Sequence, residues 1–337
     1  MGVRPPCACP CRSWSAALAA PEFLAITGAT TTGKTALSLA VAEALDGEVI
    51  SMDSRQIYRG MDIGTDKVAG GIRARIPHHG VDIRDPDESY SAGEFARDAV
   101  RWMSRIRARG RVPVLAGGTG FFLKALVEPL FEEPKLDPGR VARLRRFLAQ
   151  RGLEELERWV RVLDPERARL AVAGGIQRIE RTLEVTLLTG RPLSWWHRTA
   201  QANAPAAEGM VVVLELPRDE LYGRINERVS TMAERGMIEE VRVLAARGYG
   251  ADDPGMSGTG YREILGHLEG RLGLEEALDA TRRATRGYAR RQLTWFRNQL
   301  PPDAVRIDGL KPLETQCAEV LGAWRARGGA GRETRDR

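Results

Sequence analysis

Short apolar runs alternate with amphipathic segments from residue 23 to about residue 130. Residues 23–26, 48–52 and 112–116 are short, mainly apolar segments of strand length, which predicts three buried strands. Residues 91–109 begin at a serine and repeat apolar positions at helical spacing, which predicts a helix with a serine cap. Buried strands that alternate with helices are typical of a parallel sheet. The pattern therefore predicts an α/β fold in this half of the chain.

The pattern changes at about residue 132, where helical and arginine-rich segments begin. Asp137-Pro138 predicts the start of the first of them, and a stretch of small residues at 202–209 reads as a linker. An apolar run from Met210 then predicts a further strand of the core. Long helices are expected after it, over residues 218–235, 238–247, 261–265 and 274–298.

These changes predict a parallel-sheet core that is interrupted by a mainly helical insertion and completed by a helical C-terminal part. The expected organisation is a disordered leader (1–21), the first part of the core (22–131), the insertion (132–208), the second part of the core (209–325) and a disordered tail (326–337).

A glycine-rich segment with the spacing G-x-x-x-x-G-K-T follows the first predicted strand and precedes a helix. Its residues are Gly28, Ala29, Thr30, Thr31, Thr32, Gly33, Lys34 and Thr35. Strand, glycine loop and helix together are typical of a P-loop, whose backbone N–H groups hold anionic oxygens. Lys34 adds a positive charge, and the Thr35 hydroxyl is the usual Mg²⁺ ligand. The motif predicts a phosphate or diphosphate site, but it leaves the bound compound and any phosphoryl transfer open.

Two further polar residues follow predicted strands, Asp53 after the second and Thr119 after the third. Parallel sheets bind ligands outside the carboxyl ends of their strands, so both residues are expected to meet the P-loop in one cleft. Asp53 there suits a Mg²⁺ ligand or a general base, although an N-cap is an alternative. The glycines around Thr119 fit either a simple strand-to-helix turn or the wall of a channel.

The adjacent His78 and His79, followed by Asp82, suggest a metal site at first sight. Two neighbouring histidines of a regular element do not easily face one metal, so structural or turn roles are favoured. No later apolar strand ends in a clear Walker B acid, which argues against a motor or GTPase. Small-substrate kinases and related transferases remain.

Composition further narrows the classes of protein to which this chain can belong. The chain has 337 residues, 43% hydrophobic and 28% charged, with a net charge of +6. Arginine dominates its basic residues, which suits phosphate or nucleic-acid contact but also follows from a GC-rich genome. Cys7, Cys9 and Cys11 lie in the leader and Cys317 lies far away, so neither a zinc site nor a disulfide framework is indicated. No run is long enough to span a membrane and no targeting signal is evident, so a cytoplasmic location is expected.

Several strings in fixed order resemble the tRNA dimethylallyltransferase family, also called the tRNA isopentenyl-transferases, in its bacterial form. After the P-loop comes Asp53-Ser54-Arg55-Gln56-Ile57-Tyr58-Arg59-Gly60-Met61-Asp62-Ile63-Gly64-Thr65. The other matching strings are Pro77-His78-His79, Tyr90-Ser91-Ala92, Gly117-Gly118-Thr119, Gln177-Arg178-Ile179-Glu180-Arg181, Gly260-Tyr261-Arg262 and the segment 288–297. The resemblance covers roughly residues 22 to 325 and is far more specific than a P-loop alone.

The resemblance implies that the N6 amine of an adenosine 3′ to the anticodon attacks C1 of dimethylallyl diphosphate, with release of diphosphate. The loop is of the nucleotide-binding (ATP-binding) type, but it would hold this leaving diphosphate rather than ATP. Asp53 would be the base, while Thr30, Lys34, Arg228 and Mg²⁺ on Thr35 would stabilise the leaving group.

The resemblance also implies that the adenosine leaves the anticodon-loop stack and enters a channel. Residues Asp53 to Gln56 would contact the base, and Thr119 would line the channel. The arginine-rich insertion would clasp the anticodon stem-loop through its phosphates. The implied tRNA contacts are Asp53, Ser54, Arg55, Gln56, Thr119, Arg140, Val141, Gln177, Arg178, Ile179, Glu180, Arg181, Gly260, Tyr261 and Arg262.

The chain departs from the family pattern at two places. Its loop reads Ala29-Thr30-Thr31-Thr32 where Pro-Thr-Ala-Ser is common, and Gly80 replaces an apolar residue after the histidine pair. Prenylation of free adenine nucleotides, a small-molecule kinase that uses ATP and a non-catalytic RNA-binding protein are the alternative functions. Nothing in the sequence suggests an obligate dimer, so a monomer is expected.

Overall fold

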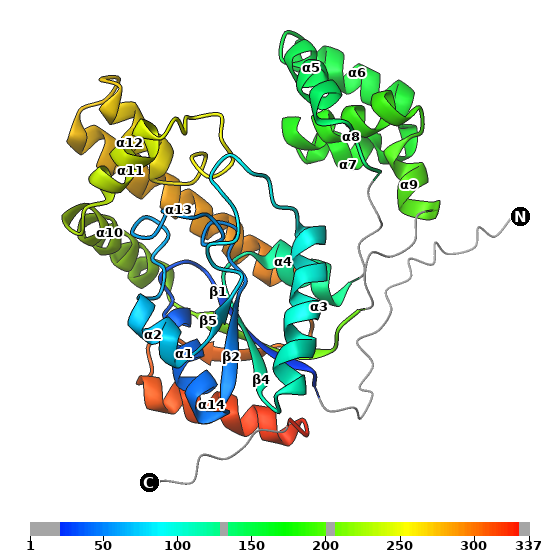
Figure 1. The fold of residues 1–337 in the computed structure, drawn as a ribbon. Helices are drawn as coiled ribbons and strands as arrows, with labels where there is room; N and C mark the ends of the chain where they lie inside the picture. Colours follow the sequence, from blue (N-terminus) through cyan, green and yellow to red (C-terminus); the bar gives the residue numbers. More distant parts are fainter. Residues whose placement is uncertain (1–20, 129–133, 200–205, 330–337) are drawn as a thin grey trace, which may run out of the picture. The chain divides into compact units, whose positions relative to one another are not determined.

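This computed structural model, which describes residues 21–128, 134–199 and 206–329, contains a six-stranded parallel sheet (Figure 1). The strand order is β3-β2-β4-β1-β5-β6. The strands are β1 (Phe23–Gly28), β2 (Gly47–Ser51), β3 (His78–His79), β4 (Val112–Ala116), β5 (Gly209–Glu215) and β6 (Val305–Asp308). The α/β fold that the sequence predicts is confirmed.

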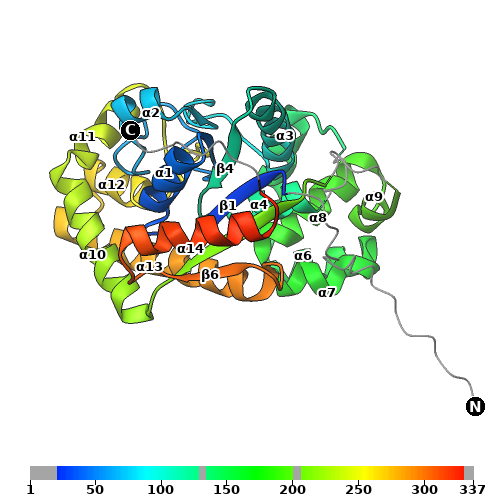
Figure 2. The same cartoon turned by 90° about the horizontal axis from the view of Figure 1, so that it is seen from below.

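Helices cover both faces of the sheet (Figures 1 and 2). On one face lie α1 (Lys34–Ala44) and α14 (Leu313–Ala326), and on the other lie α3 (Ala92–Ala108), α4 (Gly120–Val127) and α13 (Leu274–Gln299). Alternate strand residues such as Leu24, Ile26 and Val212 share one buried cluster with Leu37 of α1 and Trp324 of α14. Alternation along each strand thus supplies an apolar surface to both helical layers.

Neither edge strand of the sheet is predicted from the sequence. β3 has two residues and β6 has four, too few for a periodic pattern to stand out. The His79 side chain lies 2.7 Å from the carboxylate of Glu48 on the neighbouring β2, so the histidine pair has a structural role here. Gly80 follows with φ of 77°, a left-handed conformation that explains why an apolar residue is absent.

A second buried cluster lies beyond the carboxyl edge of the sheet. It joins α10 (Arg218–Glu234), α11 (Met237–Ala246) and α12 (Tyr261–Leu268) to the loop that follows β2. Ile57 and Met61 of this loop are buried against Val241 and Tyr261. The short α2 (Gly70–Arg75) leads from this loop to β3. The loop that carries Asp53 is therefore held by a core of its own.

Contacts divide the chain into two compact units, residues 1–128 with 206–337, and residues 129–205. The second unit is helical, with a core that includes Leu148, Val160 and Leu183. Its helices are α5 (Pro138–Leu148), α6 (Leu153–Leu163), α7 (Pro165–Ala173), α8 (Ile176–Thr189) and α9 (Leu193–Thr199). Asp137 caps α5 by accepting a hydrogen bond from the Arg140 amide at 2.7 Å.

The expected leader and the cysteines at 7, 9 and 11 lie outside the described residues. At the other end, α14 runs to Ala326, and Arg327 still pairs with Asp303 at 2.9 Å. Ordered chain therefore reaches beyond the expected start of the tail at 326.

Candidate active site

The carboxyl ends of β1, β4 and β2, which are neighbours in the sheet, bring the three predicted segments together. Backbone hydrogen bonds connect them directly. Met52 N donates to Ala116 O at 2.7 Å, Gly117 N to Ile26 O at 3.2 Å, and Thr119 N to Met52 O at 3.2 Å. The P-loop, the segment from Asp53 and the segment around Thr119 thus form one site, as parallel-sheet topology predicts.

The loop between β1 and α1 has the backbone of an anion cradle. Gly33 has φ of 96° and precedes α1, while Thr31 adopts φ of 65°, which is unfavourable for a β-branched residue. The Thr31 hydroxyl is buried and has no hydrogen-bond partner among the described residues. A ligand oxygen would supply the missing partner. At the start of the loop, a Cβ on Gly28 would lie 2.7 Å from the Leu214 carbonyl oxygen, so this position requires glycine.

The charge of Lys34 is influenced by two other predicted site residues. Its ammonium donates to the Ala29 carbonyl at 2.6 Å. Burial and the positive charge of Arg228 lower the pKa of Lys34 to about 8, against an opposing effect of Asp53. Arg228 comes from α10 and also pairs with Asp66 at 3.4 Å. Lys34, Arg228 and Asp53, all predicted site residues, are therefore close enough to influence one another's charge.

Asp53 turns the chain immediately after β2. Its Oδ1 accepts a hydrogen bond from the Arg55 amide at 2.8 Å, and no described residue donates to its other oxygen. The backbone amide of Ser54, the residue after Asp53, donates to the Thr119 hydroxyl at 3.1 Å. Asp53 is thus not a helix cap. It is a half-buried carboxylate with one oxygen available, beside a fixed hydroxyl.

The side chains of Arg55 and Gln56 hold the site loop in place. Arg55 donates to the Pro254 carbonyl at 2.5 Å and to the Ser257 hydroxyl at 3.3 Å. The Gln56 amide accepts from the Ser51 hydroxyl at 2.8 Å and donates to the Thr65 carbonyl at 3.2 Å. The structure therefore brings the loop after β2 against the segment that leads into α12.

Of the three predicted residues at the start of α12, only Arg262 is exposed. Gly260 and Tyr261 are buried, and the Tyr261 hydroxyl donates to Glu240 at 2.6 Å within the second core. Burial, and then the negative charge of Glu240, raise the pKa of Tyr261. In this arrangement Tyr261 supports the loop after β2, and Arg262 is the one that faces solvent.

The predicted contacts of the second unit lie at the start of α5 and of α8. Arg140, Gln177 and Arg178 are exposed, Val141 and Glu180 are partly exposed, and Ile179 is buried in the core of the unit. Arg181 pairs with the buried Glu184 at 3.4 Å. Of this set, therefore, Arg140, Gln177 and Arg178 are the residues with exposed side chains in the second unit.

Helix α13 adds two site residues that the reading of the sequence missed. Burial, and then the negative charge of Asp53, raise the pKa of Tyr288. Gln292 contacts both the P-loop and the segment before Thr119. The two residues are four positions apart and so share a helix face. This spacing and the family-like segment 288–297 that contains both residues were the available signals, but only the fold shows which face meets the site.

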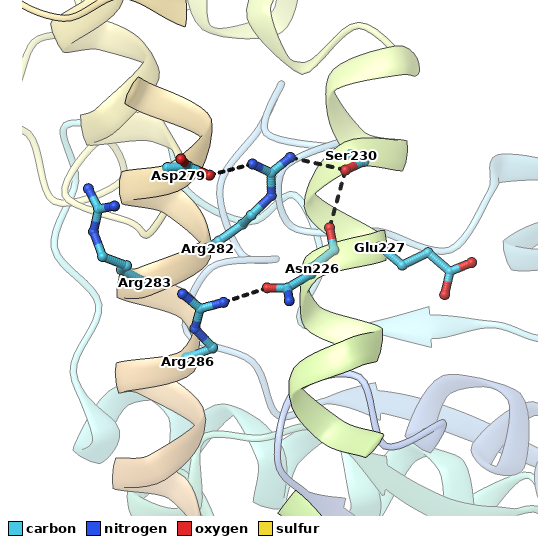
Figure 3. A pocket seen from close by; sticks show the side chains of 7 residues that line it. All are labelled: Asn226, Glu227, Ser230, Asp279, Arg282, Arg283 and Arg286. Atoms are coloured by element: carbon cyan, nitrogen blue, oxygen red, sulfur yellow. Dashed lines mark hydrogen bonds and ion pairs between the residues drawn. The ribbon is translucent and has the colours of Figure 1, made fainter. Parts of the chain in front are cut away.

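A basic groove of about 530 Å³ lies between α10 and α13 (Figure 3). Arg282 pairs with Asp279 at 2.6 Å, and Arg286 donates to the neutral Asn226 at 2.7 Å. No described residue pairs with Arg283, and the figure shows Glu227 turned away from the arginines. The remaining lining residue is Ser230. The groove therefore has positive charge in excess, which suits anionic ligands.

Within the described ranges, no group of three or more His, Cys, Asp or Glu side chains is arranged to hold a metal. His78 and His79 are therefore not part of such a group among the described residues. None of the helices in this part of the chain is both long and apolar enough to cross a membrane.

Comparisons with known proteins agree with one another. A family model described as "IPP transferase" matches residues 56–299, and one described as "Isopentenyl transferase" matches residues 21–70. The tRNA dimethylallyltransferase of Halorhodospira halophila is 44% identical over 303 residues, which cover 89% of this chain and 97% of that protein. That of Geobacillus thermodenitrificans is 42% identical over 301 residues, with 89% and 95% covered.

Solved structures give the same result. The tRNA isopentenylpyrophosphate transferase of Bacillus halodurans superimposes with a TM-score of 0.65 at 35% identity, covering 91% of this chain and 97% of that one. A eukaryotic dimethylallyltransferase described as acting on tRNA superimposes with a TM-score of 0.75 at 24% identity, a likeness of fold.

Proposed function

Because this chain belongs to the tRNA dimethylallyltransferase family, we propose that it transfers a dimethylallyl group from dimethylallyl diphosphate to tRNA. The acceptor is the N6 amine of the adenosine on the 3′ side of the anticodon, and diphosphate is released. The observation that carries the proposal is that backbone hydrogen bonds join the ends of β1, β2 and β4, from which the P-loop with Lys34 and the segment from Asp53 extend. A predicted anion site next to a carboxylate supports this reaction.

We assign the binding of the diphosphate to the P-loop. As the bond from C1 to the bridging oxygen breaks, negative charge grows on the diphosphate. The loop amides, the Thr30 hydroxyl, Lys34 and Arg228 stabilise that charge. Burial matters here, because charges interact more strongly in a site shielded from water.

Mg²⁺ is the cofactor that the family implies, and Thr35 is the protein ligand that we propose for it. Thr35 is exposed at the start of α1, and its hydroxyl is a hard oxygen donor of the kind that Mg²⁺ prefers. Mg²⁺ usually keeps several waters and binds phosphate oxygens, so the absence of a carboxylate cluster among the described residues is compatible with it. When bound, the ion supplies positive charge to the diphosphate.

We assign the removal of the proton from the acceptor amine to Asp53. The adenine N6 amine forms the new bond to C1 and becomes positively charged, and its proton passes to the free Asp53 oxygen. An aromatic amine is a weak nucleophile, so a base within hydrogen-bond reach contributes to the rate. Thr119 and Ser54, which are hydrogen-bonded to each other next to Asp53, would contact the incoming base.

We propose that tRNA is held by surfaces on both units. The second unit contributes its exposed polar residues, Arg140, Gln177 and Arg178, and the first contributes Arg262. The groove between α10 and α13 supplies further arginines for backbone phosphates. Free nucleotides would need none of these surfaces, which favours RNA over the nucleotide-prenylating alternative. A cytoplasmic monomer fits this function.

A transfer assay tests the proposal. Purified protein is incubated with labelled dimethylallyl diphosphate, Mg²⁺ and an unmodified anticodon stem-loop, with AMP and ATP as parallel acceptors. We expect label in the RNA, and a fall in kcat of about 10²–10⁴-fold for Asp53→Asn. Asp46→Asn is the matched control, because Asp46 precedes β2 at the opposite end of the same strand. Label only in AMP or ATP, or in no acceptor at all, would refute the proposal.

A further inference from the structure

Helix α13 reaches into the site through the buried side chain of Gln292, which is 6% exposed. Its Oε1 accepts a hydrogen bond from the Thr30 amide of the P-loop at 2.9 Å. Its Nε2 donates to the Gly118 carbonyl at 2.8 Å. One amide group therefore bridges the two loops that the proposed function assigns to the two substrates.

The surrounding geometry is built around this bridge. A Cβ on Gly118 would lie only 2.3 Å from the Gln292 Nε2, so glycine is required for the amide to approach. A Cβ on Gly120 would lie 2.3 Å from the ring of Trp295 on the same helix. The glycines around Thr119 thus let α13 lie directly against the loop after β4.

The bridge continues on the acceptor side. Thr119 follows Gly118 and accepts the hydrogen bond from the backbone amide of Ser54, the residue after Asp53. Hydrogen bonds through Gln292 therefore connect the P-loop to the residues beside Asp53. Only a side chain with one donor and one acceptor at this reach satisfies both backbone groups.

We propose that Gln292 is a positioning residue that couples the diphosphate loop to the acceptor channel, so that the leaving group and the attacking amine are aligned. The proposal rests on the proposed function. Alignment of reacting groups contributes to kcat more than to the binding of either substrate. Loss of the bridge should therefore reduce kcat while each substrate still binds.

Steady-state kinetics of Gln292→Met test this, since methionine has a similar size but makes neither hydrogen bond. We expect kcat to fall about tenfold or more, with the KM values for the donor and the RNA changing by less than about threefold. Gln299→Met is the matched control, because Gln299 is an exposed residue of the same helix whose side chain accepts from Lys124. An unchanged kcat, or a rise in the donor KM alone, would overturn the proposal.

Hydrogen exchange tests the coupling without any transfer reaction. Adding Mg²⁺ and diphosphate to the native protein should slow exchange in residues 28–35 and in residues 117–120. In Gln292→Met, only residues 28–35 should be protected. Gln292→Glu, which keeps the acceptor but turns an oxygen toward the Gly118 carbonyl, should behave in the same way and guards against a folding defect of the first variant. Equal protection of both segments in native and variant protein would overturn the coupling.

The two experiments separate the two proposals. If native protein and Gln299→Met transfer no label to RNA, the proposed function fails, and hydrogen exchange still decides the role of Gln292. If both are active and Gln292→Met is equally active, only the role of Gln292 fails.

Discussion

Glu240 of α11 holds the loop that follows β2, and its replacement by glutamine should loosen that loop. Its Oε2 accepts from the amides of Asp62 and Ile63 at 2.8 and 2.7 Å, and its Oε1 accepts from the Gly64 amide at 3.1 Å and the Tyr261 hydroxyl at 2.6 Å. One carboxylate therefore satisfies four donors. Glutamine offers a single acceptor oxygen, so about half of these bonds are lost.

The expected loss of stability follows from the number and exposure of these bonds. A hydrogen bond to a charged group contributes about 1.5–3 kcal/mol, and water replaces the exposed bond of Asp62 at a smaller loss. We therefore expect Glu240→Gln to reduce the free energy of unfolding by about 2–4 kcal/mol. Because the same loop begins at Asp53, kcat should fall as well.

Urea unfolding, with hydrogen exchange followed at residues 62–64, measures this loss. Glu239→Gln is the matched control, since Glu239 is the neighbouring residue, its side chain is 62% exposed and it pairs only with Arg242 on the surface. Its effect should stay within about 0.5 kcal/mol. If Glu240→Gln were no more destabilising than Glu239→Gln, the carboxylate would not be what holds the loop.

Two other substitutions probe the stability of the fold. Burial alone would raise the pKa of Glu48, but hydrogen bonds from Arg109 and His79 outweigh it and hold the pKa below its ordinary value of 4.5. Glu48 therefore stabilises the fold above pH 4.5, and this contribution is lost as the pH falls further. Glu48→Gln should flatten the decline of the melting temperature below pH 4.5, and an unchanged acid profile would contradict this. A Cβ on Gly64 would lie 2.6 Å from the Tyr261 ring, so Gly64→Ala should lose about 1–3 kcal/mol in urea unfolding. Gly70→Ala has nothing within 4 Å of its new Cβ and should leave stability nearly unchanged; equal effects would show that the loop adapts freely.

The sequence by itself determined the features that depend on residues close together in the chain or on a general rule of parallel sheets. The spacing of Gly28, Gly33 and Lys34 specifies the loop between β1 and α1, because the left-handed conformation of Gly33 arises within the loop itself. Asp53 and Thr119 were placed by a general property of parallel sheets, whose ligands lie at the carboxyl ends of strands. For these residues, motif and topology together were sufficient.

The tertiary structure alone decided which distant side chains complete the site. Gln292 and Tyr288 lie on a helix whose amphipathic pattern shows a buried face but not what it is buried against. Arg228 was assigned by resemblance, and its approach to Lys34 depends on how α10 packs. Tyr261 and Arg262 are neighbours in sequence, yet one enters the core and the other faces solvent. Such choices depend on contacts between segments far apart in the chain, which periodicity and spacing along the chain do not encode.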